Sequence, residues 1–175
     1  MTRSIALGVL VAGLALAPAM AATETATLLG TSHDWSAFTS GSGSAKICYA
    51  MAKPATTAPK AKRDPIYFLI TDWPGRSPKT KSEPEVVPGY QYKVDSTVTA
   101  TVGTEKFELF TKNEGGAGAA WVRHRPDEIK LIEAMKRGQK LVVTGTSLRG
   151  TKTTDTYSLA GLQDALDKIH AACGF

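Results

Sequence analysis

The chain has 175 residues, of which 42% are hydrophobic, and it carries a formal net charge of +5 at pH 7. A chain of this size is typical of one domain, so a division into two domains is not expected. The basic residues are not gathered on one element among aromatic residues, which argues against a nucleic-acid-binding protein.

Residues 1–21 have the pattern of a secretory signal peptide. A basic start precedes an apolar run over residues 5–17, which is shorter than the roughly 20 apolar residues that span a bilayer. Ala19 and Ala21 place small residues at the two positions that precede a signal-peptidase cut. An N-terminal membrane anchor is the alternative, but no charged stop-transfer flank follows. We therefore expect an exported protein with one mature domain, residues 22–175, and no later transmembrane span.

The residue pattern of the mature part predicts mainly β-strands. Short segments rich in Val, Ile, Thr, Tyr and Phe are separated by Gly, Pro, Asn and Ser, which is typical of strands and turns. Because only two segments carry helix signals, a parallel α/β fold is excluded, since it needs a helix between most successive strands. The predicted fold is mainly β, a β-sandwich with a short surface helix and a C-terminal helix. The predicted strands cover residues 34–38, 46–51, 66–71, 97–102, 106–110, 119–122, 141–146 and 155–157.

Two polar segments, residues 52–63 and 73–84, flank the predicted strand at residues 66–71. If the first segment folds back along that strand, the cations of both share one edge of the domain. Such an edge would attract anionic lipid or lipopolysaccharide. The alternative is two solvated loops that charge keeps soluble. The cations concerned are Lys53, Lys60, Lys62, Arg63, Arg76, Lys79 and Lys81.

Both helices have recognisable ends. The surface helix is predicted to begin at Pro126 and to end before Gly138, with Ile129, Ile132 and Met135 on one face. The C-terminal helix is predicted to have Ser158 as its N-cap. Its apolar stripe is predicted to consist of Leu159, Leu162, Leu166, Ile169 and Cys173.

The chain has two cysteines, Cys48 and Cys173, so one intramolecular pairing exists. The oxidising space outside the inner membrane favours a disulfide between them, and the position of Cys173 on the apolar stripe directs its sulfur to the core. Two unpaired buried thiols are the alternative. Closing so long a loop is expected to stabilise the fold by about 4 to 5 kcal/mol at most.

No catalytic or metal-binding pattern is evident. The segment from Gly145 to Gly150 is one residue too long for the Gly-x-Ser-x-Gly elbow of a serine hydrolase. The three histidines, His33, His124 and His170, do not have metal-ligand spacing, and a disulfide would leave no thiol for a metal or a nucleophile. We therefore expect neither catalytic residues nor a metal or cofactor.

Several segments resemble the invasion-associated locus B family of exported bacterial proteins. The resemblance is most specific at the C-terminus, where Gly145-Thr146-Ser147 leads to Asp155-Thr156-Tyr157-Ser158-Leu159-Ala160-Gly161-Leu162 and ends at Cys173. Upstream it includes Trp35, Cys48-Tyr49-Ala50, residues 66–71, Gly89-Tyr90 and Ala134-Met135-Lys136-Arg137-Gly138. The lysine-rich insert has no place in the family pattern.

The resemblance implies an immunoglobulin-like β-sandwich in the periplasm or at the outer membrane of an α-proteobacterium. It implies no catalytic residues, and it links a founding member to invasion of host red cells. Two functions remain open. The first is a non-enzymatic envelope protein that binds its partner through a sheet face or the basic loops. The second is a cell-envelope hydrolase whose site gathers residues distant in sequence. A shallow surface with exposed aromatic residues would favour the binding protein. A deep pocket that joins His33 or His124 to carboxylates would favour the hydrolase.

Overall fold

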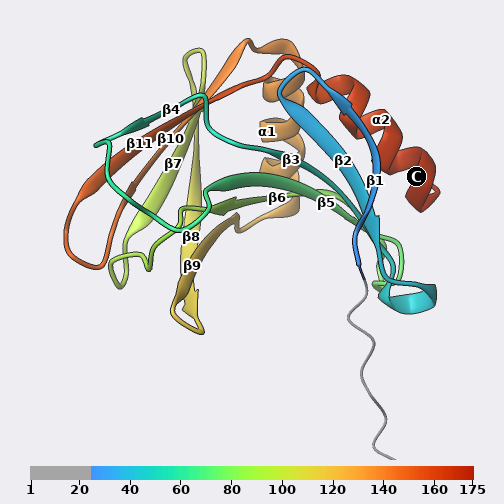
Figure 1. Ribbon diagram of the computed structural model, residues 1–175, viewed down its shortest axis with the longest axis horizontal. Coiled ribbons are helices and arrows are strands. Elements are labelled where there is room, and N and C mark those ends of the chain that lie inside the picture. Colours follow the sequence, from blue (N-terminus) through green and yellow to red (C-terminus); the bar gives the residue numbers. More distant parts are fainter. Residues whose placement is uncertain (1–24) are drawn as a thin grey trace, which may run out of the picture.

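The computed structural model describes residues 25–175, so the predicted signal peptide lies outside the described residues. Eleven strands, all paired antiparallel, and two α-helices make up this part of the chain (Figure 1), which confirms the mainly β prediction. The strands are β1 (Thr27–Ser32), β2 (Trp35–Ser40), β3 (Ile47–Ala52), β4 (Thr56–Ala58), β5 (Tyr67–Trp73), β6 (Thr80–Val87), β7 (Thr97–Val102), β8 (Glu105–Glu114), β9 (Ala117–Val122), β10 (Lys140–Thr146) and β11 (Lys152–Ser158). The helices are α1 (Arg125–Arg137) and α2 (Leu162–Cys173), and a 3-10 turn, η1 (Gly43–Ala45), precedes β3.

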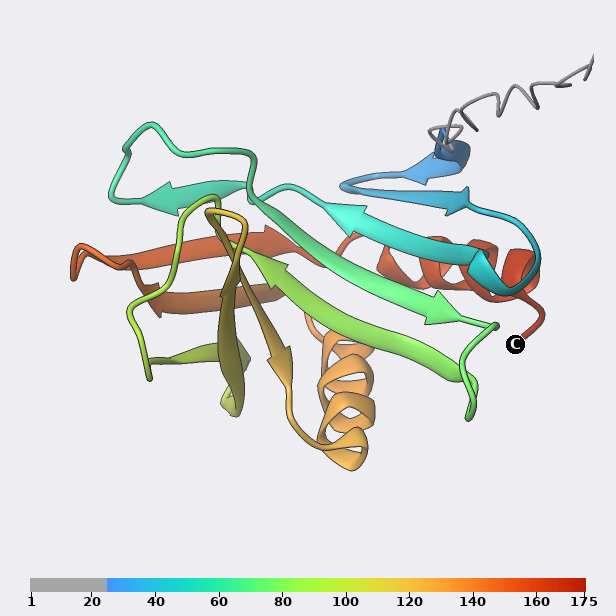
Figure 2. The same ribbon diagram turned by 90° about the horizontal axis from the view of Figure 1, so that it is seen from below.

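The strands form one bent sheet in the order β1-β2-β3-β5-β6-β9-β8-β7-β10-β11-β4. Its first arm, β1 to β6 in that order, faces its second arm, β7 to β4, across the core (Figure 2). Phe68 on β5 and Tyr157 on β11 pack edge to face with ring centroids 5.8 Å apart, although five strands separate β5 from β11 in the sheet. The two layers expected of a sandwich are therefore arms of one continuous sheet.

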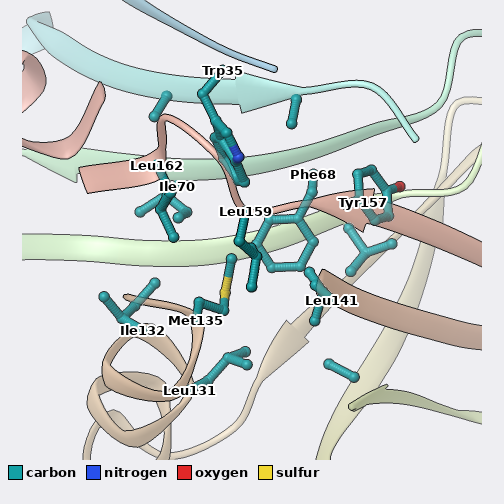
Figure 3. Packing of buried hydrophobic residues seen from close by; sticks show 14 of the residues in the cluster. Trp35, Phe68, Ile70, Leu131, Ile132, Met135, Leu141, Tyr157, Leu159 and Leu162 are labelled. Carbon is teal, nitrogen blue, oxygen red and sulfur yellow. The ribbon is translucent and has the colours of Figure 1, made fainter. Parts of the chain in front are cut away.

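Side chains alternate between the two faces of the sheet, as the pleat of a strand requires. On β3, Cys48 and Ala50 are buried on the inner face, whereas Tyr49 and Met51 are half-buried on the outer face. Helix α2 packs on the inner face of β1, β2, β3 and β5, and α1 packs against β6, β8 and β9. Figure 3 shows Met135 of α1 within the same buried cluster as Phe68.

The helix predictions need two corrections. Helix α2 begins at Leu162 after the left-handed Gly161, and Ser158 is the last residue of β11 instead of the N-cap. Ser158 remains extended because it pairs with Lys140 on β10. On α1, Ile129 is exposed, and the buried face carries Leu131 together with Ile132 and Met135.

The structure contains the disulfide predicted between Cys48 and Cys173. Cys48 lies on the inner face of β3 and Cys173 ends α2, with 6.0 Å between their Cα atoms. Lys46 adds a hydrogen bond from its Nζ to the carbonyl oxygen of Ala172, 2.6 Å away. The C-terminal helix is thus attached to the first arm at its last turn.

The sequence did not predict three strands. β1 and β4 are the edge strands of the sheet, and β6 lies in the segment expected to be a polar loop. β6 contains Pro84, although proline cannot donate to a ladder. Pro84 pairs with Ile70 of β5, but the pairing of β6 with β9 is confined to Glu85 and Val86. The missing N–H of Pro84 therefore falls outside the ladder with β9.

Candidate functional site

The outer face of the first arm and of the adjoining strands β9 and β8 is lined with aromatic and apolar side chains. We call this surface the aromatic half of the sheet. The strand register places Met51, Leu69, Glu85, Trp121 and Phe110 in one row across β3, β5, β6, β9 and β8. Neighbouring strands lie about 4.8 Å apart, so this row extends over roughly 20 Å. The aromatic half consists of Phe38, Tyr49, Met51, Tyr67, Leu69, Trp73, Phe110 and Trp121, all half-buried, with Glu83 and Glu85 among them.

Neither helix packs on the aromatic half. Helix α2 lies behind β2, β3 and β5 in Figure 2, and no helix lies in front of these strands. Among the described residues, neither the core nor the partly buried side chains packed against it include a member of the aromatic half. These side chains therefore contact mainly one another. Phe38 stacks on Tyr49 with centroids 5.2 Å apart, and Phe110 lies 5.8 Å from Trp121.

Charged groups on this surface are arranged around the two indoles. Trp73 donates from Nε1 to Glu83 Oε2 at 2.7 Å, and the Arg76 guanidinium lies 3.9 Å from the Trp73 ring while pairing with Glu83 at 2.8 Å. Arg123 lies over Phe110 at 4.8 Å. Burial, followed by repulsion from Glu83, raises the pKa of the Glu85 carboxyl, and a hydrogen bond from Trp121 opposes that shift.

The same face of the second arm is chemically different. Thr97 lies opposite Phe110, so the outer surface continues onto β7 without interruption. Register then aligns Thr99 with Thr144 on β10 and Thr154 on β11. We call this surface the threonine half of the sheet. It consists of Thr97, Thr99, Thr101, Thr144, Thr154 and Thr156.

The structure separates the seven cations predicted to share one edge. The first group precedes β5 and the second follows it, so they lie at opposite ends of that strand. Lys53, Lys60 and Lys62 are exposed on the segment around β4. In the second group, Lys79 is exposed, Lys81 is half-buried and Arg76 lies over the Trp73 ring of the aromatic half. The seven do not form a single basic surface.

Arg63 is a correction to the expectation of exposed cations, because its side chain is only 8% exposed. It forms two hydrogen bonds with Asp155, from Nη1 to Oδ2 at 3.0 Å and from Nη2 to Oδ1 at 2.5 Å. Arg63 lines a cleft of about 590 Å³ together with Lys62 and Arg149. Because Arg63 is paired with Asp155, it offers no free charge there.

A contact between Ser82 and His170 was not predicted, because the two residues are 88 positions apart. Ser82 Oγ lies 2.8 Å from His170 Nε2, and Asp72 Oδ1 lies 3.8 Å from that same nitrogen. In a Ser-His-Asp relay the carboxylate holds the opposite ring nitrogen, Nδ1. Burial, with Lys81 and Lys136, lowers the pKa of His170 to about 4, and burial raises that of Asp72 to about 6. The arrangement does not match a hydrolytic relay.

The other two histidines lie on the surface of the molecule. His33 is exposed between β1 and β2, and His124 is exposed directly before α1. Within residues 25–175, no three His, Cys, Asp or Glu side chains are close enough together to hold a metal ion. No helix in this range has the length and apolar character required to cross a membrane.

The sequence contained a signal for the aromatic half: two of its strands lack the usual alternation of polar and apolar residues. Residues 66–70, Ile-Tyr-Phe-Leu-Ile, and 47–52, Ile-Cys-Tyr-Ala-Met-Ala, are apolar at both odd and even positions. A strand of a two-layered antiparallel domain normally has one polar face. Continuous apolar character on both faces therefore indicated a second surface of this kind outside the core.

Comparison with protein families matches residues 35–170 to the model of the invasion-associated locus B protein. Among solved structures, the chain resembles the crystal structure of invasion-associated protein B from Bartonella henselae with a TM-score of 0.56. The two sequences are 14% identical, and the alignment covers 83% of this chain and 98% of the other. At this identity the likeness concerns the fold. No curated protein matches the chain.

Proposed function

Because the chain belongs to the invasion-associated locus B family, we propose that it is an exported bacterial protein that acts without catalysis, by binding a component of the cell envelope or of a host surface. The observation that carries this proposal is the aromatic half of the sheet. Soluble monomers seldom expose large contiguous apolar surfaces, and those that occur often mark interaction sites. Aromatic side chains are also enriched in the centres of protein interfaces.

Export is supported by the disulfide, since such bonds persist in oxidising compartments such as the periplasm. We propose cleavage after Ala21, so that the mature protein begins at Ala22. Mass spectrometry of the exported protein tests this directly. A mass that includes residues 1–21 would contradict it.

Binding through the aromatic half is tested by co-sedimentation of the mature protein with bacterial envelope fragments. Leu69→Lys places a charge in the central row of this surface, and Thr144→Lys adds the same charge to the threonine half. We expect the first variant to lose roughly ten-fold or more in affinity, as for disruption of an interface hot spot, and the second to bind like wild type. Equal binding by all three proteins, or none by the wild type, would contradict the proposal.

The exposed lysines of the first loop remain a second route to the envelope, by attraction to anionic lipid or lipopolysaccharide. Lys53, Lys60 and Lys62 are at the end of β5 away from Arg76 and Lys79, so they would act without the second group. Charge attraction of this kind weakens once salt shortens the screening length below about 10 Å. Co-sedimentation with anionic vesicles at roughly 0.02 M and 0.3 M salt measures this contribution. Equal sedimentation of wild type and a variant neutralised at all three lysines would exclude it.

The hydrolase alternative rests on the contact of Ser82 with His170. Ser82 is buried, and the carboxylate of Asp72 does not orient the imidazole for catalysis. Ser82→Ala would abolish any envelope hydrolysis that used this group. We expect wild type and variant to release equal amounts of soluble envelope material.

A further inference from the structure

The balance of charges on the aromatic half limits the kind of partner it suits. Glu83 and Glu85 bring two carboxylates, and Arg76 and Arg123 bring two guanidinium groups. Arg76 pairs with Glu83, and the faces of Trp73 and Phe110 already carry these two cations. The surface therefore has no net charge, although the whole chain is basic. Neither a strongly cationic nor a strongly anionic partner gains from long-range attraction to it.

The two carboxylates of this surface are its strongest acceptors, and some of their donors come from the surface itself. The indole of Trp73 donates to Glu83, and that of Trp121 donates to Glu85, so both ring nitrogens already have acceptors. An ionised carboxylate has about four acceptor sites. Trp73 and Arg76 each donate to Glu83, and Trp121 donates to Glu85, so both carboxylates retain free acceptor sites. The surface thus offers aromatic ring faces beside carboxylate oxygens with acceptor capacity to spare. A complementary partner supplies hydroxyl donors together with apolar C–H groups.

The shape of the surface favours an extended ligand. The central row crosses five neighbouring strands from Met51 to Phe110, with Trp121 and Glu85 between them. Rigid aromatic rings supply contact area there at a low cost in conformational entropy. A linear polymer that lies across the strands contacts Met51, Leu69 and Trp121 in succession.

From these features we propose that the partner bound by the aromatic half is an uncharged, hydroxyl-rich glycan, whose sugar rings pack on Trp121 and its neighbours while their hydroxyl groups donate to Glu83 and Glu85. This inference rests on the proposed function, because it names the ligand of the same surface. An apolar protein segment is the competing occupant. It would use the rings but leave the remaining acceptor sites of the carboxylates unused.

Chemical treatment of the envelope fragments distinguishes these partners. Periodate cleaves vicinal diols and so opens sugar rings, whereas protease removes proteins. We expect co-sedimentation of the mature protein to be lost after periodate, and to persist after protease digestion with washing and at 1 M salt, a condition that shortens the screening length to about 3 Å. Sedimentation that survives periodate, or that protease or salt abolishes, would overturn the glycan assignment. If sedimentation survives periodate or is abolished by protease, the proposed function would still stand.

Three variants link the glycan to the rings. Trp121→Ala is expected to weaken sedimentation roughly ten-fold or more, as for loss of an aromatic hot spot, whereas Trp121→Phe, which keeps a ring, retains most of it. Tyr49→Ser changes the same surface three strands away and is expected to weaken it several-fold. Thr144→Ala is the matched control in the threonine half. Far-UV circular dichroism confirms that each variant is folded. Wild-type binding by folded Trp121→Ala and Tyr49→Ser would refute the inference.

Discussion

The outer face of this sheet has two halves of opposite character on one continuous surface. Phe110 in the aromatic half and Thr97 in the threonine half are direct neighbours across β8 and β7. Threonine favours strands and remains compatible with water, so the second arm needs no partner. The first arm carries half-buried rings that water solvates poorly. The apolar outer surface is therefore confined to one part of the sheet and is not a general property of the whole sheet.

The inner faces of the two arms differ as well. Beneath the threonine half, Asp155 forms two hydrogen bonds with Arg63. On the inner face of the first arm, Asp72 is fully buried, accepts one hydrogen bond from the Ser82 amide, and keeps its Oδ2 without a hydrogen bond. Buried carboxylates are costly unless they are paired. The buried carboxylate of the first arm therefore has fewer hydrogen-bond partners than that of the second.

The largest expected effect comes from the disulfide, which belongs to the first arm alone. Replacing both Cys48 and Cys173 with alanine should lower the free energy of unfolding by up to about 4 to 5 kcal/mol, because the unfolded chain regains the entropy of a long loop. Denaturant titration measures the loss. Hydrogen exchange should rise more in β2 and β3 than in β7 and β10. A uniform rise in both arms would show that the disulfide does not support the aromatic half in particular.

Loss of a ring from either face of the first arm is the next prediction. Phe68→Ala opens the core and should cost about 3 to 5 kcal/mol of stability. Phe38→Ala, on the outer face, removes the stacking with Tyr49 and should cost about 1 kcal/mol. Urea unfolding of the two variants gives both values. Similar costs would mean that the aromatic half is part of the stabilising core.

The smallest effect concerns pH. The folded pKa of Asp72 is raised to about 6, so its contribution to stability is full below its unfolded value near 3.8 and is lost as pH rises through 6. The folded pKa of His170 is lowered to about 4, so its contribution is full above its unfolded value near 6.5 and is lost as pH falls through 4. Between pH 4 and 6 the two contributions have opposite slopes.

Single substitutions separate these slopes. Relative to wild type, Asp72→Asn should gain stability as pH rises across this window, and His170→Gln should lose it. Urea midpoints at several pH values for the three proteins provide the test. If the urea midpoints of the three proteins changed in parallel with pH, the pKa shifts assigned to Asp72 and His170 would be contradicted. The acidic and basic groups common to all three proteins cancel in the differences.

Local signals were sufficient to predict part of this architecture. The cysteine count predicted the disulfide, and the spacing of Leu162, Leu166 and Ile169 predicted the buried face of α2. The Ser82–His170 contact and the Arg63–Asp155 pair depend on how distant strands come together, and no local pattern encodes that. The β6 strand was missed because its first half lies in a segment interpreted as a polar loop. The seven cations were grouped by their proximity in sequence, although β5 separates them.

Covalent footprinting tests the central claim most directly. Hydroxyl radicals oxidise exposed side chains, and mass spectrometry reads the extent with and without bound envelope fragments. We predict protection of Tyr49, Met51 and Trp121 on binding, with no change at Leu148, an exposed apolar residue outside the aromatic half. Unchanged oxidation of Tyr49, Met51 and Trp121 in the bound protein would show that the aromatic half does not contact the partner.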